Sequence, residues 1–152
     1  MSDQHTPLTA VREGIQDANR GLAALTRAGG ALDFGTAELV KVRVSQINGC
    51  AYCVDLHAGT AAEAGEDHRR LHALAVWEES PFFTARERAA LALAEALTVP
   101  PMGPIDPAVA LEVEREFPEA DERNALVATI IGINAWNRVM ISDGAQPPAL
   151  GD

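Results

Sequence analysis

The sequence is short of three features, cysteine, basic residues and long apolar runs, and each shortage excludes a class of protein. Its two cysteines, three residues apart, cannot form the disulfide scaffold of a secreted protein. The 12 Lys and Arg are outnumbered by 22 Asp and Glu, and the net charge of -10 argues against nucleic acid or an anionic membrane as a partner. No segment has about 18 uninterrupted apolar residues, and the N-terminus lacks the pattern of a signal peptide. We therefore expect a cytoplasmic protein with no membrane partner.

The remaining composition is that of a globular protein. With 152 residues, 47% of them hydrophobic, the chain is long enough for one domain with a substantial core. No internal repeat, linker or low-complexity segment divides the sequence. We expect a single domain over residues 1–152, with its core at about 8–142 and a loose tail at 143–152.

Apolar residues recur at helical spacing along most of the chain, and no convincing alternating strand is needed. The predicted fold class is therefore all-α, a bundle of about six to seven helices. The predicted helices cover about 8–28, 36–47, 50–64, 71–79, 84–99, 106–117 and 120–142. Pro100 and Pro101 are expected to end the fifth of these.

Capping residues mark several of the predicted helix starts. Thr36 is the expected N-cap of the second helix, whose many β-branched residues leave a strand as the alternative. Thr84 and Glu87 form a capping box, and Asp106 followed by Pro107 supplies an N-cap and a first-turn proline.

The chemistry is predicted to lie in the stretch ELVKVRVSQINGCAYCVDLH, residues 38–57, which holds both cysteines. If a helix opens after Asn48 and Gly49, then Cys50, Cys53 and His57 share one face, because they are spaced i, i+3 and i+7. Cys50 would lie at the helix N-terminus, where unpaired N–H groups favour a thiolate. The spacing indicates redox chemistry, with packing or metal binding as the alternatives.

Glu38 is the candidate acid of this site, although a first-turn acid on a solvated face is the simpler interpretation. If the two helices flanking Gly49 form an antiparallel hairpin, Glu38 lies roughly 15 Å before the turn and His57 roughly 12 Å after it. The two side chains can then meet. A Glu–His–Cys chain would pass protons and hold the imidazole in one orientation.

These residues, Glu38, Cys50, Cys53 and His57, match an E-x11-C-x2-C-x3-H pattern. The pattern resembles that of the alkylhydroperoxidase D-like branch of the carboxymuconolactone decarboxylase family, and the similarity extends over most of residues 30–142. The resemblance implies an all-helical fold whose subunits associate as dimers, trimers or hexamers. It also implies a thiol-dependent peroxidase that needs no metal or organic cofactor.

The resemblance further implies a role for each motif residue. Cys53 is similar to the thiol that reacts with a peroxide and becomes a sulfenic acid, and Cys50 to a more exposed partner that closes a disulfide. His57 and Glu38 are similar to the proton relay. The expected partners are a small peroxide substrate and an external dithiol reductant. Some peroxidase members carry a further histidine directly before the second cysteine, where this chain has Tyr52.

Two other functions stay open. The family also contains decarboxylases of lactone acids, a chemistry that does not require the two cysteines. Alternatively, the protein is not an enzyme, and Cys50, Cys53, His57 and Glu38 bind zinc, although a straight helix face is an awkward place for tetrahedral ligands.

Overall fold

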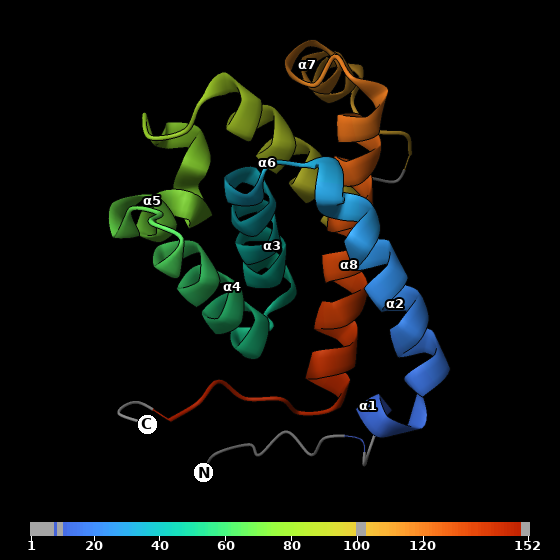
Figure 1. Cartoon of the computed structure of the whole chain (residues 1–152). Helices are drawn as coiled ribbons and strands as arrows, with labels where there is room; N and C mark the ends of the chain where they lie inside the picture. The colour runs from blue at the N-terminus through green and yellow to red at the C-terminus, as the bar shows by residue number, and fades with distance from the viewer. Residues whose placement is uncertain (1–7, 9–10, 100–102, 150–152) are drawn as a thin grey trace.

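The computed structural model describes residue 8 and residues 11–99 and 103–149. These residues form helices and no strand, which confirms the predicted all-α fold (Figure 1). The helices are α1 (Val11–Gly14), α2 (Gln16–Ala28), η1 (Gly29–Ala31), α3 (Phe34–Asn48), α4 (Ala51–Glu63), α5 (His68–Ala73), η2 (Leu74–Glu79), α6 (Ala85–Thr98), α7 (Pro107–Glu116) and α8 (Ala120–Ser142). The predicted stop at Pro100 and Pro101, and the last three residues of the predicted tail, lie outside the described residues.

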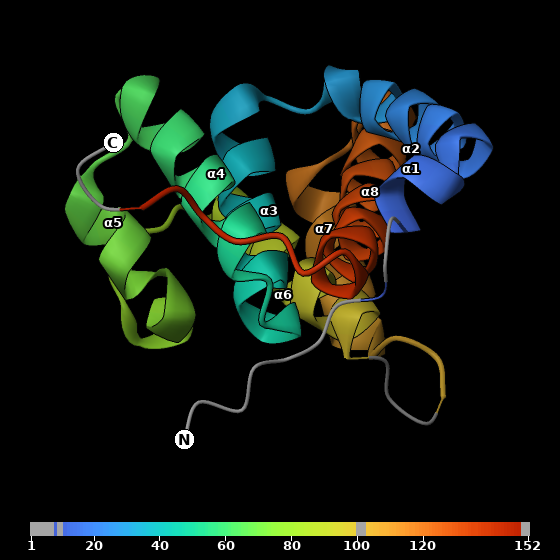
Figure 2. The same cartoon turned by 90° about the horizontal axis from the view of Figure 1, so that it is seen from below.

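Helix α3 occupies the centre of the structure. It packs against α4 on one side and against α8 on the other, while α2 lies alongside α8 (Figures 1 and 2). Helix α6 also contacts α3 and α8. The larger apolar cluster joins α3, α6, α7 and α8, and its fully buried members include Val40, Val44, Phe117, Leu126 and Ile130. A second cluster joins α3, η2 and α6 through residues that include Leu39, Val42, Leu74 and Leu91.

The central position of α3 explains its ambiguous sequence. Val40, Val42 and Val44 are each 1% exposed or less, so their β-branched side chains are buried on more than one face of the helix. The strand alternative is wrong, and tertiary burial overrides the low helix propensity of these residues. Thr36 is not the N-cap. Helix α3 begins at Phe34 after Asp33, whose carboxylate accepts the Thr36 N–H at 2.9 Å.

Two predicted helices are interrupted, and these interruptions together with the short η1 account for the larger number of elements in the described residues. The segment predicted as 8–28 contains two helices, α1 and α2, that meet at Ile15, whose backbone is not helical. The helix predicted at 71–79 begins earlier as α5 and continues as the 3₁₀-helix η2, which contains a non-helical residue at Val76. Gly14 precedes the first interruption, whereas no Gly or Pro marks the second in the sequence.

Helix α8 is the one helix, among the described residues, that is long and apolar enough to cross a membrane by length and composition. In this structure it is a core helix that packs against α2, α3 and α6. Leu126, Ile130 and Ile133 are buried on it. Contact with the neighbouring helices therefore accounts for the apolar residues on its buried faces.

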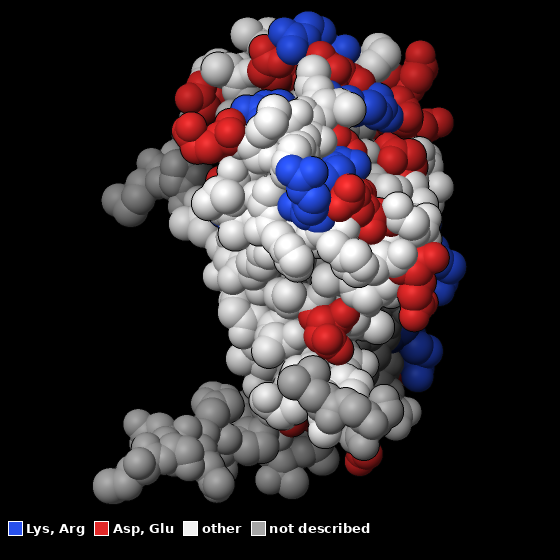
Figure 3. Space-filling view, turned by 90° about the vertical axis from the view of Figure 1, so that its left-hand side faces the viewer, with Lys and Arg blue, Asp and Glu red and all other residues white. Residues whose placement is uncertain are grey.

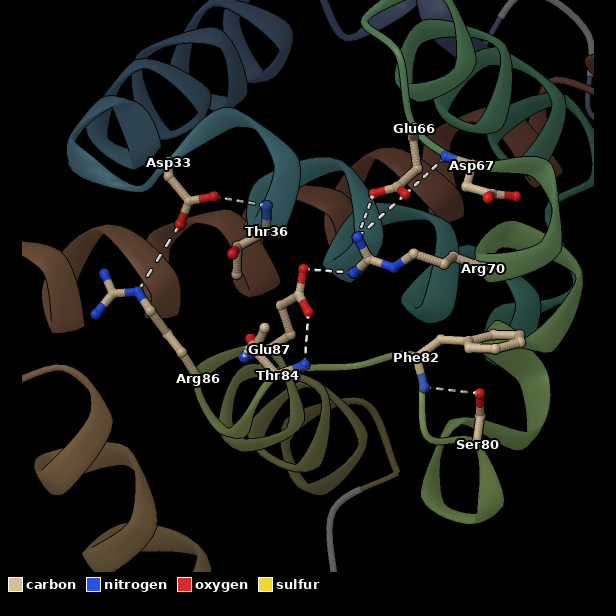
Figure 4. A network of polar contacts seen from close by, with 10 residues as sticks. All are labelled: Asp33, Thr36, Glu66, Asp67, Arg70, Ser80, Phe82, Thr84, Arg86 and Glu87. Atoms are coloured by element: carbon tan, nitrogen blue, oxygen red, sulfur yellow. Dashed lines mark hydrogen bonds and ion pairs between the residues drawn. The ribbon is translucent and has the colours of Figure 1, made fainter.

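Ion pairs and caps hold the start of α6 against α5. Arg70 donates to Glu66 at 3.2 Å and to Glu87 at 2.5 Å (Figure 4). Glu87 also accepts the Thr84 N–H at 2.8 Å, which completes the predicted capping box. On the face shown in Figure 3, acidic and basic side chains lie next to one another, mainly in its upper half.

The close packing of η1 on α8 depends on Gly29. A Cβ atom at this position would overlap the Thr129 hydroxyl, whereas a Cβ at the neighbouring Gly30 would meet nothing within 4 Å. Gly29→Ala should therefore lower the free energy of unfolding by about 1–3 kcal/mol, because the buried hydroxyl or the helix must move. Chemical denaturation measures the difference, and Gly30→Ala is the matched control. Equal stability of the two variants would contradict this packing.

Candidate active site

The site is built on the hairpin between α3 and α4. Gly49 ends α3 in the left-handed conformation, with φ 71°, which glycine adopts without steric cost. The next N–H, that of Cys50, donates to the Ser45 carbonyl at 3.0 Å. The chain therefore reverses at one glycine, and α4 starts with Cys50 as its N-cap.

Cys50 and Cys53 form a disulfide, with their Cα atoms 5.3 Å apart. The Cys50 sulfur also accepts the Cys53 N–H at 3.3 Å, so it takes part in capping the helix. Relative exposure is 2% for Cys50 and 3% for Cys53. The expectation that Cys50 is the more exposed cysteine is therefore wrong for this state, because the N-cap position turns its sulfur back onto the first turn of α4.

The structure brings Glu38 and His57 together across the hairpin. The His57 Nδ1 lies 2.8 Å from one carboxylate oxygen of Glu38. The ammonium of Lys41, one turn along α3, donates to the other oxygen at 2.6 Å. Glu38 is only 2% exposed, so a buried carboxylate is shared between an imidazole and an ammonium.

The two partners of Glu38 determine its charge. Burial by itself raises the pKa of the Glu38 carboxyl, but the hydrogen bonds with His57 and Lys41 and the charge of Lys41 outweigh burial, so the pKa lies below its ordinary value. Glu38 is then a carboxylate at neutral pH and accepts hydrogen bonds only. His57 must carry a hydrogen on Nδ1, which leaves its Nε2 for other chemistry.

A cavity of about 270 Å³ lies beside Cys53. Its walls come from α2, α3, α4 and α8 and are mostly apolar, with Lys41 and His57 as the basic side chains. They are Thr26, Lys41, Tyr52, Cys53, Leu56, His57, Thr129, Gly132, Ile133, Trp136 and Met140. The Trp136 indole N–H donates to the Thr26 hydroxyl at 3.1 Å, which joins α8 to α2 at the wall.

Cys50 borders a different space. It lines an open surface hollow together with Gln46, Gly49, Val54 and other residues of the hairpin. Cys53 does not line this hollow, and Cys50 does not line the cavity. The two sulfurs of the disulfide therefore border different spaces, Cys53 the apolar cavity and Cys50 the surface hollow.

A buried polar network fixes the hairpin turn to α8. The side-chain amide of Asn48 donates to the side-chain oxygens of Asn137 at 2.9 Å and Asn134 at 3.0 Å. Asn137 is fully buried and donates to the Ser45 hydroxyl at 3.0 Å. Because Ser45 also binds the Cys50 N–H through its carbonyl, the network holds the residue that starts the active-site helix.

The zinc hypothesis finds no support in this geometry. Within the part of the chain that the structure describes, no group of three His, Cys, Asp or Glu side chains is arranged to hold a metal ion. The two cysteines are joined to each other, and Nδ1 of His57 is occupied by Glu38.

The four motif residues lie in a segment that matches a known protein family. Residues 13–96, which include all four motif positions, match the model of the carboxymuconolactone decarboxylase family. The chain belongs to the carboxymuconolactone decarboxylase family.

Three curated proteins of uncharacterized function are similar to this chain in sequence. The chain is 39% identical over 109 residues to the uncharacterized protein YdfG of Bacillus subtilis, covering 72% of this chain and 74% of YdfG. It is also 39% identical over 77 residues to YnjA of Escherichia coli, which covers 51% of this chain but 42% of that protein. The match to Rv2313c of Mycobacterium tuberculosis, 34% identical, covers 78% of this chain and 40% of the relative. This chain therefore spans less than half of the last two proteins.

Solved structures agree on the fold. A protein of Agrobacterium tumefaciens, for which a role in antioxidant defence of the AhpD type has been suggested, superposes with a TM-score of 0.83 at 29% identity, covering 90% of this chain and 94% of that one. A peroxidase-related protein of a Silicibacter species gives 0.74 at 21% identity and covers 86% and 70% of the two chains. The debrominase Bmp8 gives 0.75 at 22% identity and covers 88% and 73%. The last two show the fold alone, and family membership points to enzymes with antioxidant or peroxidase-related chemistry.

Sequence reasoning missed Lys41 and the cavity walls from α2 and α8. Lys41 had a usable signal, because it lies one helical turn after Glu38 and is the only lysine of the chain. Thr26 and Trp136 had none, since only the packing of α2 and α8 on the hairpin brings them to Cys53.

The lowered pKa of Glu38 predicts how stability depends on pH. Ionised Glu38 stabilises the folded chain above its ordinary pKa of 4.5, and this contribution is lost as pH falls through the lower native pKa. The stability advantage of the wild type over Glu38→Gln should therefore shrink as pH falls below about 4.5, as measured by thermal unfolding.

The matched control is Glu63→Gln, which changes an exposed carboxylate of α4. Its stability relative to the wild type should change little over the same range. A constant difference between the wild type and Glu38→Gln at all pH values would contradict the pairing of an ionised Glu38.

Proposed function

We propose that this protein is a thiol-dependent peroxidase that reduces organic hydroperoxides with Cys53 and Cys50 and is regenerated by an external dithiol. One observation carries the proposal. The Cys50–Cys53 disulfide has Cys53 in the wall of an apolar cavity and Cys50 in the wall of an open surface hollow, and the same cavity is lined by His57, which is paired with the buried Glu38.

The reaction proceeds in three balanced steps. The Cys53 thiolate attacks the O–O bond of ROOH, forms the sulfenic acid and expels RO⁻, which takes a proton from the site and leaves as ROH. The Cys50 thiol then attacks the sulfenic sulfur, forms the disulfide and releases water. An external dithiol finally reduces the disulfide by exchange and is itself oxidised to a disulfide.

His57 and Glu38 are the acid–base pair of these steps. With Nδ1–H held by the Glu38 carboxylate, Nε2 of His57 is free to take the Cys53 proton and deliver it to the leaving oxygen. The negative charge of Glu38 stabilises the imidazolium formed in between. Tyr52, which lies at the cavity wall directly before Cys53, supplies no equivalent of the additional histidine found in some peroxidase members.

The environment of each sulfur supports a division of roles. Cys53 lines the apolar cavity, which suits the organic part of a hydroperoxide better than a small polar peroxide. Cys50 borders the open hollow, where a dithiol reductant has room to approach. The proposed cycle requires a reducing compartment, in agreement with a cytoplasmic location.

The other interpretations receive less support from the site. Decarboxylation of a lactone acid requires neither a dithiol nor a disulfide, so it leaves the Cys50–Cys53 pair unexplained. Zinc binding would require both sulfurs as thiolates around one point.

Replacing each cysteine should block the proposed cycle at a different step. Reduced Cys50→Ser should consume one equivalent of cumene hydroperoxide, accumulate a sulfenic acid on Cys53 that a dimedone-type probe traps, and then stop, because no resolving thiol remains. Reduced Cys53→Ser should react poorly from the start, because Cys50 does not line the cavity. Intact mass measures both products against the wild type.

If the probe instead traps an adduct on Cys50 in Cys53→Ser, and Cys50→Ser does not react, the roles of the two cysteines are the reverse of those proposed. A wild-type protein that turns over no hydroperoxide with an excess of dithiol would refute the peroxidase function itself.

We further propose that the protein is a homo-oligomer. Val127 and Ile131, one turn apart on α8, are 36% and 50% exposed, and Phe34 at the start of α3 is 54% exposed. Apolar side chains of this size on a regular helix face are typical of subunit contacts. Light scattering at micromolar concentration should give a multiple of 16.1 kDa. A 16.1 kDa particle would contradict the proposal.

A further inference from the structure

Lys41 stands out in both the sequence and the site. The chain has 12 basic residues, of which eleven are arginine and one is this lysine. The arginines bind acids and carbonyls over the scaffold, as Arg70 and Arg86 do. Lys41 instead lies between the buried Glu38 and the cavity beside Cys53. The only lysine of the protein is therefore part of its active site.

The two oxygens of Glu38 have different partners. One is 2.6 Å from the Lys41 ammonium and the other is 2.8 Å from His57 Nδ1. A carboxylate with one oxygen held in this way cannot rotate without breaking an ion pair that is largely shielded from water, since the side chain of Glu38 is 3% exposed and that of Lys41 is 21% exposed. The position of His57 therefore depends on Lys41, which is hydrogen-bonded to Glu38 and not to His57 itself.

We propose that Lys41 is a positioning residue, whose ammonium keeps Glu38 ionised and oriented so that its second oxygen accepts the Nδ1–H of His57. The inference deepens the proposed function, on which it rests, by adding a third member to the proton relay. Lys41 acts through Glu38 and His57 rather than on the sulfur.

The surroundings of Glu38 support a single source of positive charge at this carboxylate. On α3, Lys41 is the neighbouring cation, and from α4 only His57 faces the carboxylate. A shallow hollow on the far side of Glu38 is also lined by Glu66 and Arg70, but Arg70 is engaged by Glu66 and Glu87. Helix α8 contributes no titratable side chain to the cavity. Among the described residues, Lys41 and His57 are therefore the basic side chains paired with Glu38.

Without Lys41, fewer interactions oppose the effect of burial on the pKa of Glu38. Burial raises the pKa of the Glu38 carboxyl, and Lys41 lowers it through a hydrogen bond and through its charge. Without Lys41 the carboxyl becomes protonated at a higher pH, and a protonated Glu38 no longer holds a Nδ1–H tautomer of His57 by charge. Assistance to Cys53 is then lost at a higher pH than in the wild type.

The test measures the reactivity of Cys53 without a peroxide. In the reduced Cys50→Ser background Cys53 is the only thiol, and its rate of alkylation by iodoacetamide, an uncharged reagent, is followed from acid to alkaline pH. In Lys41→Met the acid limb of this profile should move to higher pH, because assistance by His57 depends on an ionised Glu38, whose pKa rises when the adjacent opposite charge is lost. Lys41→Arg, which keeps the charge, should give an acid limb close to that of the wild type.

Arg43→Met is the matched control, because it removes a cation of the same helix that pairs with Glu95 instead. Its acid limb should coincide with that of the wild type. An unmoved acid limb in Lys41→Met, or an equal movement in Arg43→Met, would overturn the role of Lys41. Since alkylation needs no hydroperoxide, these outcomes are independent of whether the protein is a peroxidase.

A second measurement uses the protein without changes at Lys41. Lysine labelled with ¹⁵N at Nζ gives one side-chain signal, because the chain has one lysine. The ammonium protons of a lysine paired with a buried carboxylate exchange slowly, so the signal should be observed in the wild type at neutral pH and be lost in Glu38→Gln. A signal that behaves like that of a solvated lysine in both proteins would overturn the pairing.

Discussion

A buried carboxylate is tolerated only when each of its oxygens has a partner, and this requirement sets the register of the α3–α4 hairpin. Glu38 finds one partner on its own helix, Lys41, and the other across the turn, His57. A shift of α4 along α3 would separate His57 from Glu38 and leave a buried acceptor unpaired. The left-handed Gly49 then closes the hairpin at the one point that allows this register.

The sequence allowed the elements of the site to be predicted because they are local. The Cys50–Cys53–His57 spacing lies within one helix, and the distance from Glu38 to His57 follows from helix rise and one turn. The capping box at Thr84 was equally local and is confirmed.

What could not be predicted depends on tertiary contacts. Asp33 displaced Thr36 as the cap of α3, and η2 is irregular at Val76 without a Gly or Pro to announce it. The burial of Cys50 follows from the direction in which an N-cap side chain points, which spacing alone does not reveal. The cavity is formed by four helices, two of which are far from the motif in sequence, so no local pattern contains it.

Helix α8 connects the rigid part of the site with its cavity. One turn of it holds the hairpin through Asn134 and Asn137, and Trp136, directly before Asn137, forms part of the cavity wall. Adjacent positions on a helix point to different sides, so a single segment of α8 serves both purposes. A displacement of α8 would thus move the turn before Cys50 and the wall opposite Cys53 together. The geometry of the disulfide and the shape of the cavity are therefore mechanically linked, although they share no hydrogen bond.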